Sequence, residues 1–293
     1  MVCNRSVSIM DSKLFSLSFY RVPVFEIWHT TIARRMLLWE MSKRDIRDRY
    51  VGQMLGTFWA ILTPVLIMSI YLFIFAFVFK IRIPTESDNM TQGWGGSYTL
   101  YLLSGLVPWM SFQEIINRST TIITSNSNLV KQVIFPLEVL PLKILSSAML
   151  TQFVGLTIFL LYGIVRFGLP TPMMLLLPVV MFFQIVAGAG IALLFGAVGV
   201  FLRDLKDIIS MLCFICIYLM PVFFTESMIP NALYKVLLIN PLSHMILCYH
   251  DVLYWGNFVS PLSWLLFPFF SILLFILGSR VFFSLKTMFG NVL

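Results

Sequence analysis

The feature that most constrains this chain is a set of long stretches that contain no Asp, Glu, Lys or Arg. A membrane-crossing helix needs about 20 apolar residues to span roughly 30 Å of hydrocarbon. Six runs reach or approach that length: 50–79, 89–113, 144–165, 167–202, 208–225 and 252–279. Charged residues make up 11% of the chain, against about 25% in soluble domains. The sequence therefore predicts an all-α integral membrane protein and excludes disordered, fibrous and disulfide-rich secreted classes.

These stretches predict six transmembrane helices joined by short charged connections. We expect the helices near residues 57–79, 97–118, 143–165, 173–201, 207–225 and 261–283. A further uncharged run, 236–250, is too short to cross a bilayer and follows a break between Pro221 and Pro230. It predicts short extracellular re-entrant helices within residues 227–259, between the fifth and sixth spans.

The basic residues predict the orientation. With the N-terminus in the cytoplasm, 16 of the 20 Lys and Arg residues lie on the cytoplasmic side, and the reversed topology would put the same 16 outside. Cytoplasmic loops of membrane proteins are enriched in Lys and Arg. We therefore expect both termini inside, with residues 1–50 as a cytoplasmic segment and residues 51–293 as the membrane domain.

The segment before the first span has a helical pattern of its own. Large apolar residues recur there at spacings of three and four: Phe25, Trp28, Ile32, Met36 and Trp39. Basic residues occupy the other faces, so the pattern favours an amphipathic helix at the inner headgroup layer, with the tryptophans as anchors. A cytosolic packing helix is the alternative.

Small residues mark places where helices approach closely. Gly188, Ala192 and Gly196 repeat every fourth residue in the fourth predicted span. Such spacing lets two helix backbones come together. The pattern leaves open whether the neighbour belongs to the same chain.

Sequence signatures of catalysis are missing. The chain has no Gly-Lys dipeptide, and therefore no phosphate-binding loop of the Walker type. H-E-x-x-H and G-x-S-x-G are absent, and the three histidines lack ligand spacing. Cys213 and Cys216 lie in an apolar run, where they are interpreted as small packing residues. We expect no catalytic, metal or cofactor site on this chain and no nucleic-acid partner, so any energy for transport must come from a second polypeptide.

One acidic residue, Glu114, falls well inside a predicted span, four residues before Arg118 and near the inner end. Side chains four apart on a helix can pair. The pair is either structural or part of a gate that opens when helices move.

The largest inside loop, 119–142, is the candidate contact for an energy-supplying partner. Asn126 or Ser127 is expected to cap a short helix that starts at Asn128 and ends before Pro136. An apolar edge of this helix would lie beside Lys131 and consists of Leu129, Val133 and Ile134.

Several motifs of the chain resemble those of ABC-2 permeases that export polysaccharides, the membrane subunits of O-antigen, capsule and teichoic-acid exporters. In chain order, these motifs are Arg44-Asp45…Arg49-Tyr50, Leu55-Gly56…Trp59…Pro64, Gly105-Leu106-Val107-Pro108-Trp109…Phe112, Asn128-Leu129-Val130-Lys131-Gln132-Val133-Ile134-Phe135-Pro136…Leu140-Pro141, Arg203-Asp204, Pro221 and Asn240-Pro241-Leu242. They cover about residues 40 to 260. The chain departs from the family at Gln132 and Leu137, where basic residues are common, and at His250-Asp251, where an arginine often precedes the last helix.

The resemblance implies a half-transporter of the bacterial inner membrane. Two copies would form the pathway for a polysaccharide or lipid-linked glycan, and two copies of a separate ATPase, which binds ATP and magnesium, would dock below. The loop helix would couple the two, through Asn128, Leu129, Lys131, Val133, Ile134 and Phe135.

Aromatic side chains of the first two spans are the candidate pathway residues, because rings offer sugars a low-specificity surface. They are Trp59, Tyr71, Tyr98, Tyr101, Trp109 and Phe112. With 45 aromatic residues in the chain, most of them must instead face lipid or pack the core. Two other functions stay open at this point: an ABC-2 exporter of a small molecule or lipid, and a membrane protein without transport activity, such as a lipid-modifying enzyme or a scaffold.

Overall fold

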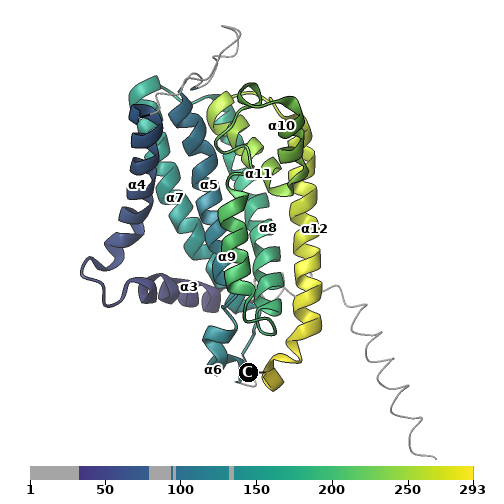
Figure 1. Cartoon of the computed structure of the whole chain (residues 1–293). Coiled ribbons are helices and arrows are strands. Elements are labelled where there is room, and N and C mark those ends of the chain that lie inside the picture. The colour runs from purple at the N-terminus through teal and green to yellow at the C-terminus, as the bar shows by residue number, and fades with distance from the viewer. Residues whose placement is uncertain (1–32, 79–93, 95–96, 132–134, 293) are drawn as a thin grey trace, which may run out of the picture.

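The computed structural model describes residues 33–78, 94, 97–131 and 135–292, and this part of the chain is helical without strands (Figure 1). The longer helices run along a common direction, except α3, which lies across it at one end (Figure 1). The long elements are α3 (Arg35–Tyr50), α4 (Trp59–Leu72), α5 (Tyr98–Ser119), α7 (Val139–Phe167), α8 (Leu177–Val198), α9 (Leu205–Cys216) and α12 (Pro261–Lys286). The short ones are α6 (Ser127–Val130), α10 (Asn231–Ile239), α11 (Pro241–His250) and α13 (Phe289–Val292).

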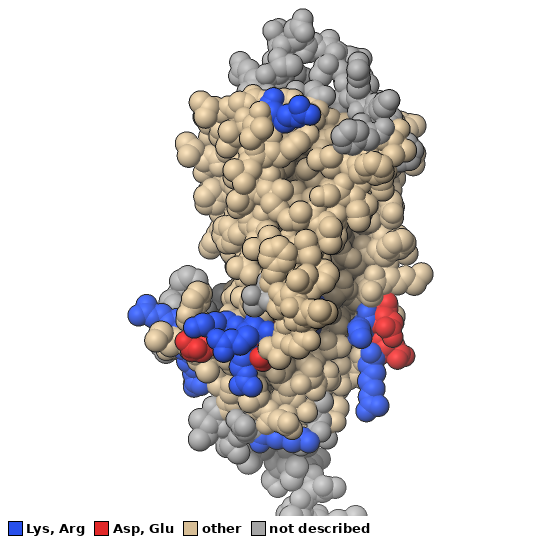
Figure 2. Space-filling model, turned by 90° about the vertical axis from the view of Figure 1, so that its left-hand side faces the viewer, with Lys and Arg blue, Asp and Glu red and all other residues tan. Residues whose placement is uncertain are grey.

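Two ends of the bundle are distinguished below by their helices. The α3 end carries α3 and α6, and the α10 end carries α10 and α11 (Figure 1). On the face turned to the viewer in Figure 2, acidic and basic side chains gather toward the α3 end, and a broad uncharged surface lies between them and the α10 end. An uncharged band of this kind suits the hydrocarbon of a bilayer.

Three described helices are long and apolar enough to cross a membrane: Val139–Phe167, Pro172–Val198 and Pro261–Lys286. A bent pair, Ala232–Ile239 with Pro241–Trp255, makes a fourth if it is counted as one span. Six spans therefore stay a prediction. The expected fifth helix, 207–225, is shorter than predicted, because α9 ends at Cys216 and turns follow. Pro221 has no N–H to donate and disfavours helix at the residue before it, which explains the early end.

The two short helices of the α10 end occur where re-entrant helices were predicted. α10 and α11 meet at 105°, and Pro241 starts α11 directly after the bend. The Asn240 Oδ1 atom accepts a hydrogen bond of 3.0 Å from the Leu242 amide and so caps α11. A helix pair this strongly bent fits a re-entrant hairpin.

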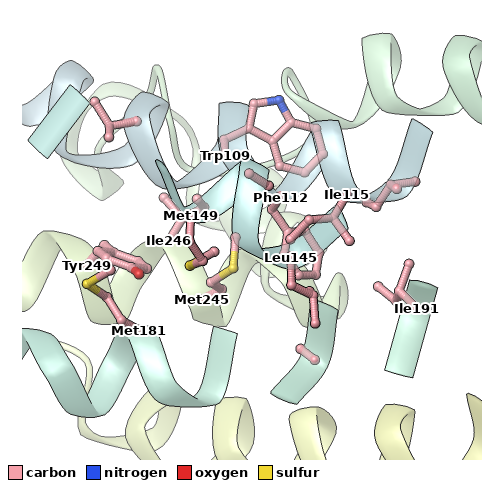
Figure 3. Packing of buried hydrophobic residues seen from close by; sticks show 14 of the residues in the cluster. Trp109, Phe112, Ile115, Leu145, Met149, Met181, Ile191, Met245, Ile246 and Tyr249 are labelled. Carbon is pink, nitrogen blue, oxygen red and sulfur yellow. The ribbon is translucent and has the colours of Figure 1, made fainter. Parts of the chain in front are cut away.

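The core brings α5, α7, α8 and α11 together (Figure 3). Its centre contains a polar lock: the Gln152 and Gln184 amides exchange hydrogen bonds of 2.9 and 2.8 Å, and the Tyr249 hydroxyl binds both side chains. All three side chains are fully buried. Because each polar group has a partner, the lock joins α7, α8 and α11 at little cost of desolvation.

A close backbone approach lies between α8 and α12. A Cβ atom added at Gly278 would lie 2.0 Å from the Gly190 carbonyl oxygen, and one at Gly190 would lie 2.5 Å from the Leu274 carbonyl. The sequence pattern had pointed to Gly188 and Gly196. A Cβ at Gly188 would meet only side-chain atoms, at 3.0 Å, and one at Gly196 would have nothing nearer than 3.4 Å. The tight crossing therefore falls between the predicted positions.

Substituting alanine for Gly278 is expected to destabilise the protein, because the new methyl group collides with backbone that cannot rotate away. Thermal unfolding of the purified chain in detergent should show a midpoint lowered by several degrees. Gly290→Ala is the matched control, since nothing lies within 4 Å of its added Cβ atom. Equal midpoints for the two variants would contradict the close packing of α8 on α12.

Candidate functional site

Two neighbouring hollows lie on one side of α5, and together we call them the groove. The larger, toward the α10 end, has a volume of about 740 Å³, and the smaller, toward the α3 end, about 360 Å³. Both are lined by Ile67 and Tyr71 of α4, which makes these residues the junction. The other walls come from α5 and from residues that follow α9, between Ile217 and Met228. The groove thus lies between α4, α5 and the turns after α9.

Aromatic rings dominate the larger hollow. The rings that line it are those of Tyr71, Phe75, Tyr98, Tyr218, Phe223 and Phe224. They contact one another, with ring centroids 5.5 Å apart for Phe75 and Tyr98, 5.9 Å for Phe75 and Phe223, and 5.5 Å for Tyr218 and Phe223. A cluster of this kind offers flat apolar faces rather than a set of fixed polar contacts.

Side chains of α5 and α11 hold the turns after α9 in place. The Tyr98 hydroxyl donates to the Phe223 carbonyl at 2.7 Å, and the Tyr101 hydroxyl lies 2.9 Å from the Pro221 carbonyl. His250 Nε2 lies 2.9 Å from the same Pro221 oxygen. Buried carbonyls that have left a helix need such donors. Both tyrosine hydroxyls are therefore engaged in hydrogen bonds to the backbone of these turns.

His250, one of the residues at which this chain departs from the family it resembles, also helps to hold these turns. His250 is fully buried, stacks on the Tyr101 ring at 4.1 Å and lies 2.8 Å from the Ser104 hydroxyl. The neighbouring Asp251 carboxylate accepts instead from the Trp264 indole, at 3.0 Å, and from the Ser260 amide, at 3.2 Å. His250 and Asp251 thus bind different parts of the fold.

Below the smaller hollow, ion pairs tie α3 to the bundle. The predicted pair of Glu114 and Arg118 is present at 3.3 Å. Each residue has a closer partner on α3, since Glu114 binds Arg49 and Arg118 binds Asp45 at 2.6 Å. Lys143 of α7 lies 3.6 Å from the same Asp45. We call these five residues the α3 network.

Hydroxyl groups complete the α3 network. Ser147 of α7 accepts from Arg118 at 2.6 Å and from Arg49 at 3.2 Å. Ser42 of α3 donates to Ser146 at 3.0 Å. Burial lowers the pKa of the Arg49 guanidinium, but the Glu114 carboxylate outweighs burial and raises that pKa above its ordinary value. Arg49 therefore stays charged at any physiological pH and remains available to pair with Glu114.

The predicted pathway residues separate into two groups. Tyr71, Tyr98 and Trp109 line the groove. Tyr101 and Phe112 are buried in the core of the protomer, and Trp59 is half-buried at the start of α4, outside the lining of either hollow.

Four groove aromatics were missed by the sequence reading: Phe75, Tyr218, Phe223 and Phe224. The spacing of Tyr71 and Phe75, four apart on one helix, was a usable signal for the first. The turns after α9 pass through Pro221. Their rings line the larger hollow and belong to Tyr218, Phe223 and Phe224.

The helix predicted within the loop 119–142 is shorter than expected. α6 starts at Ser127 and ends at Val130, well before Pro136. The Asn126 side chain caps nothing in α6, because its amide donates to the Ile122 carbonyl of the preceding turn at 2.7 Å. α6 projects beyond α3 at its end of the bundle (Figure 1).

The predicted coupling residues have different surroundings. Asn128 and Lys131 are exposed, Leu129 packs partly against the core, and Phe135 is half-buried against it. Val133 and Ile134 lie outside the described residues. The exposed surface of α6 is therefore polar, and the predicted apolar edge lies at least partly against the bundle.

Comparison with known proteins identifies the family of this chain. The model of the ABC-2 type transporter family matches residues 36–254. The chain belongs to this family. A relative named O-antigen export system permease protein RfbA, from Klebsiella pneumoniae, is 27% identical over 259 residues, which cover 88% of this chain and 95% of the relative. A protein of the same name from Myxococcus xanthus is 27% identical and covers 75% of this chain and 81% of its own.

A further relative, the polysialic acid transport protein KpsM of Escherichia coli, is 26% identical over 76% of this chain and 80% of its own length. As an ABC-2 family member with three or four apolar spans in its described part, the chain is a multi-pass membrane protein. Its relatives are named as permease or transport proteins, not as enzymes. Among the described residues, no three His, Cys, Asp or Glu side chains gather closely enough to hold a metal ion.

Proposed function

We propose that this chain is the membrane permease of an ABC exporter that moves a polysaccharide, free or lipid-linked, across the bacterial inner membrane. Two copies form the pathway, and two copies of a separate ATPase drive it. Each copy crosses the membrane six times, with both termini and the α3 end in the cytoplasm. The observation that carries the proposal is the groove along α5, which reaches from the α3 network to the turns after α9.

The form of the groove supports a pathway for a long polymer. It lies beside α4 and the turns after α9, and large apolar side chains on α4, on α9 and just after α4 are exposed, among them Ile70, Phe73, Met211 and Phe214. A second copy that packs on these faces would close two grooves into one channel. Within that channel, the aromatic rings contact the C–H faces of sugars weakly and repeatedly, which allows a chain to slide.

The α3 end supports the link to an ATPase. α6 presents exposed polar residues below the bundle, and the α3 network connects α3 to α5 and α7 through ion pairs. A push on α6 or α3 is thereby transmitted to α5, which forms one wall of the groove. The energy for this movement comes from ATP bound to the partner, since the chain itself lacks a phosphate-binding loop.

The test is deletion of the gene in its host, followed by complementation. Loss of one surface polysaccharide, its accumulation inside the cell, and recovery with the wild-type gene are expected. The purified chain alone should hydrolyse no ATP, and hydrolysis should appear with its partner ATPase. A deletion strain with normal surface glycans but altered drug or lipid export would overturn the proposal in favour of an exporter of small molecules or lipids.

Within the groove, Tyr71 is the residue to change, because it lines both hollows. Tyr71→Ala is expected to lower polysaccharide export several-fold, since it removes the ring at the junction of the groove, while membrane level and association with the ATPase stay normal. Tyr162→Ala, a half-buried tyrosine outside the groove lining, is the control. Export that is reduced equally in both variants would exclude a special role of the junction. Surface polysaccharide is quantified in strains with matched permease levels.

A further inference from the structure

Two buried polar atoms in the smaller hollow lack partners among the described residues. They are the Trp109 indole Nε1 and the Asn117 side-chain oxygen Oδ1. Trp109 is fully buried. Two other indoles have acceptors: the N–H of the buried Trp94 donates to the Gly168 carbonyl at 3.2 Å, and that of the half-buried Trp264 donates to Asp251 at 3.0 Å. An unsatisfied buried donor is costly and therefore asks for an explanation.

The two atoms belong to an ordered series on α5. Trp109, Gln113 and Asn117 all line the smaller hollow and are spaced four residues apart. Four helical residues rise about 6 Å, so the three side chains follow one another at that step along one face. This step is comparable with the length of one sugar unit in a polymer. Trp109 offers a donor, Asn117 an acceptor, and the Gln113 amide offers both.

The surroundings favour a neutral ligand. The carboxylate of the hollow, Glu114, is engaged by Arg49, Arg118 and the Thr151 hydroxyl. The remaining wall of the hollow consists of apolar residues and Tyr71: Ile67, Leu106, Met110 and Ile217. Neutral donors and acceptors beside apolar surface match the chemistry of a sugar, which has hydroxyl or acetamido groups at its edge and C–H faces above and below.

We propose that Trp109, Gln113 and Asn117 form a polar ladder that binds the hydroxyl or acetamido groups of successive sugar units as the polymer enters the groove from the α3 end. This inference rests on the polysaccharide function proposed above, and adds the place and the groups that recognise the sugar edge. The larger hollow then receives the chain on aromatic rings, so hydrogen bonds select at the α3 end and stacking guides toward the α10 end.

The experiment removes each polar group while keeping its volume. Asn117→Leu and Gln113→Leu replace amides with a side chain of similar size, and naphthylalanine introduced at position 109 keeps a bicyclic ring without the N–H. Met110→Leu is the matched control, because Met110 lines the same hollow and carries no hydrogen-bonding group. Export is measured by pulse-labelling of the surface polysaccharide at equal permease levels, and thermal unfolding is measured on the purified full chain.

Each polar variant is expected to export about 3- to 10-fold more slowly than wild type, the range that one lost hydrogen bond produces. The midpoint of unfolding should stay unchanged or rise for the changes at 109 and 117, since each removes an unpaired group. Export at the rate of Met110→Leu would overturn the ladder while leaving the exporter function intact. Export and unfolding midpoint falling together would also overturn it, since they would indicate a structural role. Failure of the wild-type gene to restore any polysaccharide would refute the exporter function itself.

Discussion

Arg49→Ala is expected to abolish most of the export activity and to lower the midpoint of thermal unfolding by about 4–8 °C. Removing this guanidinium leaves the Glu114 carboxylate with Arg118 at 3.3 Å as its remaining charged partner. Breaking a fully buried ion pair costs about 3–5 kcal/mol. The side chains of Arg49 and Glu114 are 26% and 17% exposed, so we expect about 2 kcal/mol after solvent screening. Most of the export activity is lost because α3 then keeps only its Asp45 ion pairs and no longer contacts Glu114, which lines the smaller hollow.

The same helix provides the control. Arg44 and Asp48 form an ion pair of 3.3 Å whose side chains are 81% and 59% exposed. Exposed pairs contribute little, so Arg44→Ala should leave stability and export near wild type. Adding Glu114→Gln to Arg49→Ala should recover part of the lost stability, because the unpaired charge is then gone. An Arg49→Ala protein that exports normally would contradict the proposed link between α3 and the groove.

Charge reversal on α6 is expected to detach the ATPase. Lys131 and Asn128 are exposed below the bundle, so Lys131→Glu combined with Asn128→Arg alters the surface offered to a partner without disturbing the core. Co-purification of the ATPase should be lost, and with it both export and the ATP hydrolysis of the complex. The unfolding midpoint of the permease should not change.

A matched substitution at the other end of the bundle tests the location. Lys235 is exposed on α10, and Lys235→Glu repeats the Lys131→Glu substitution far from α6 (Figure 1). This variant should retain its ATPase. Loss of the ATPase in both variants would indicate a general charge effect, and retention in both would show that the partner docks elsewhere.

Local patterns of the sequence predicted much of the fold. Uncharged runs located α7, α8 and α12 within a few residues, because hydropathy is a property of the segment itself. The bent pair α10 and α11 lies within residues 227–259, where the short uncharged run and the prolines around it predict a re-entrant hairpin, and the re-entrant arrangement itself stays a prediction. The end of α9 at Cys216 was not predicted, because the uncharged run continues to Thr225 while the helix does not.

The site was less predictable, since it depends on contacts between distant segments. The pair of Glu114 and Arg118 follows from helix spacing, but its partners Asp45 and Arg49 lie 73 and 65 residues away in the chain. Tyr71, Tyr98 and Trp109 line the hollows, but their place in a pathway stays a prediction. Phe112 lies on the same helix as Trp109 and is equally buried, yet it lines neither hollow. Only the packing of α5 against its neighbours decides which of its side chains border a hollow.

The glycine contact of α8 with α12 divides the protein into a fixed and a movable part. Where the two backbones touch, no side chain can rotate to accommodate a shift. We therefore expect α8 and α12 to move as one rigid unit. α4 and α9 have no such anchorage, and one face of each is exposed. We expect conformational change in a transport cycle to move α4 and α9 relative to α8 and α12. The width of the groove then depends on the positions of α4 and α9, the helices that are packed least tightly.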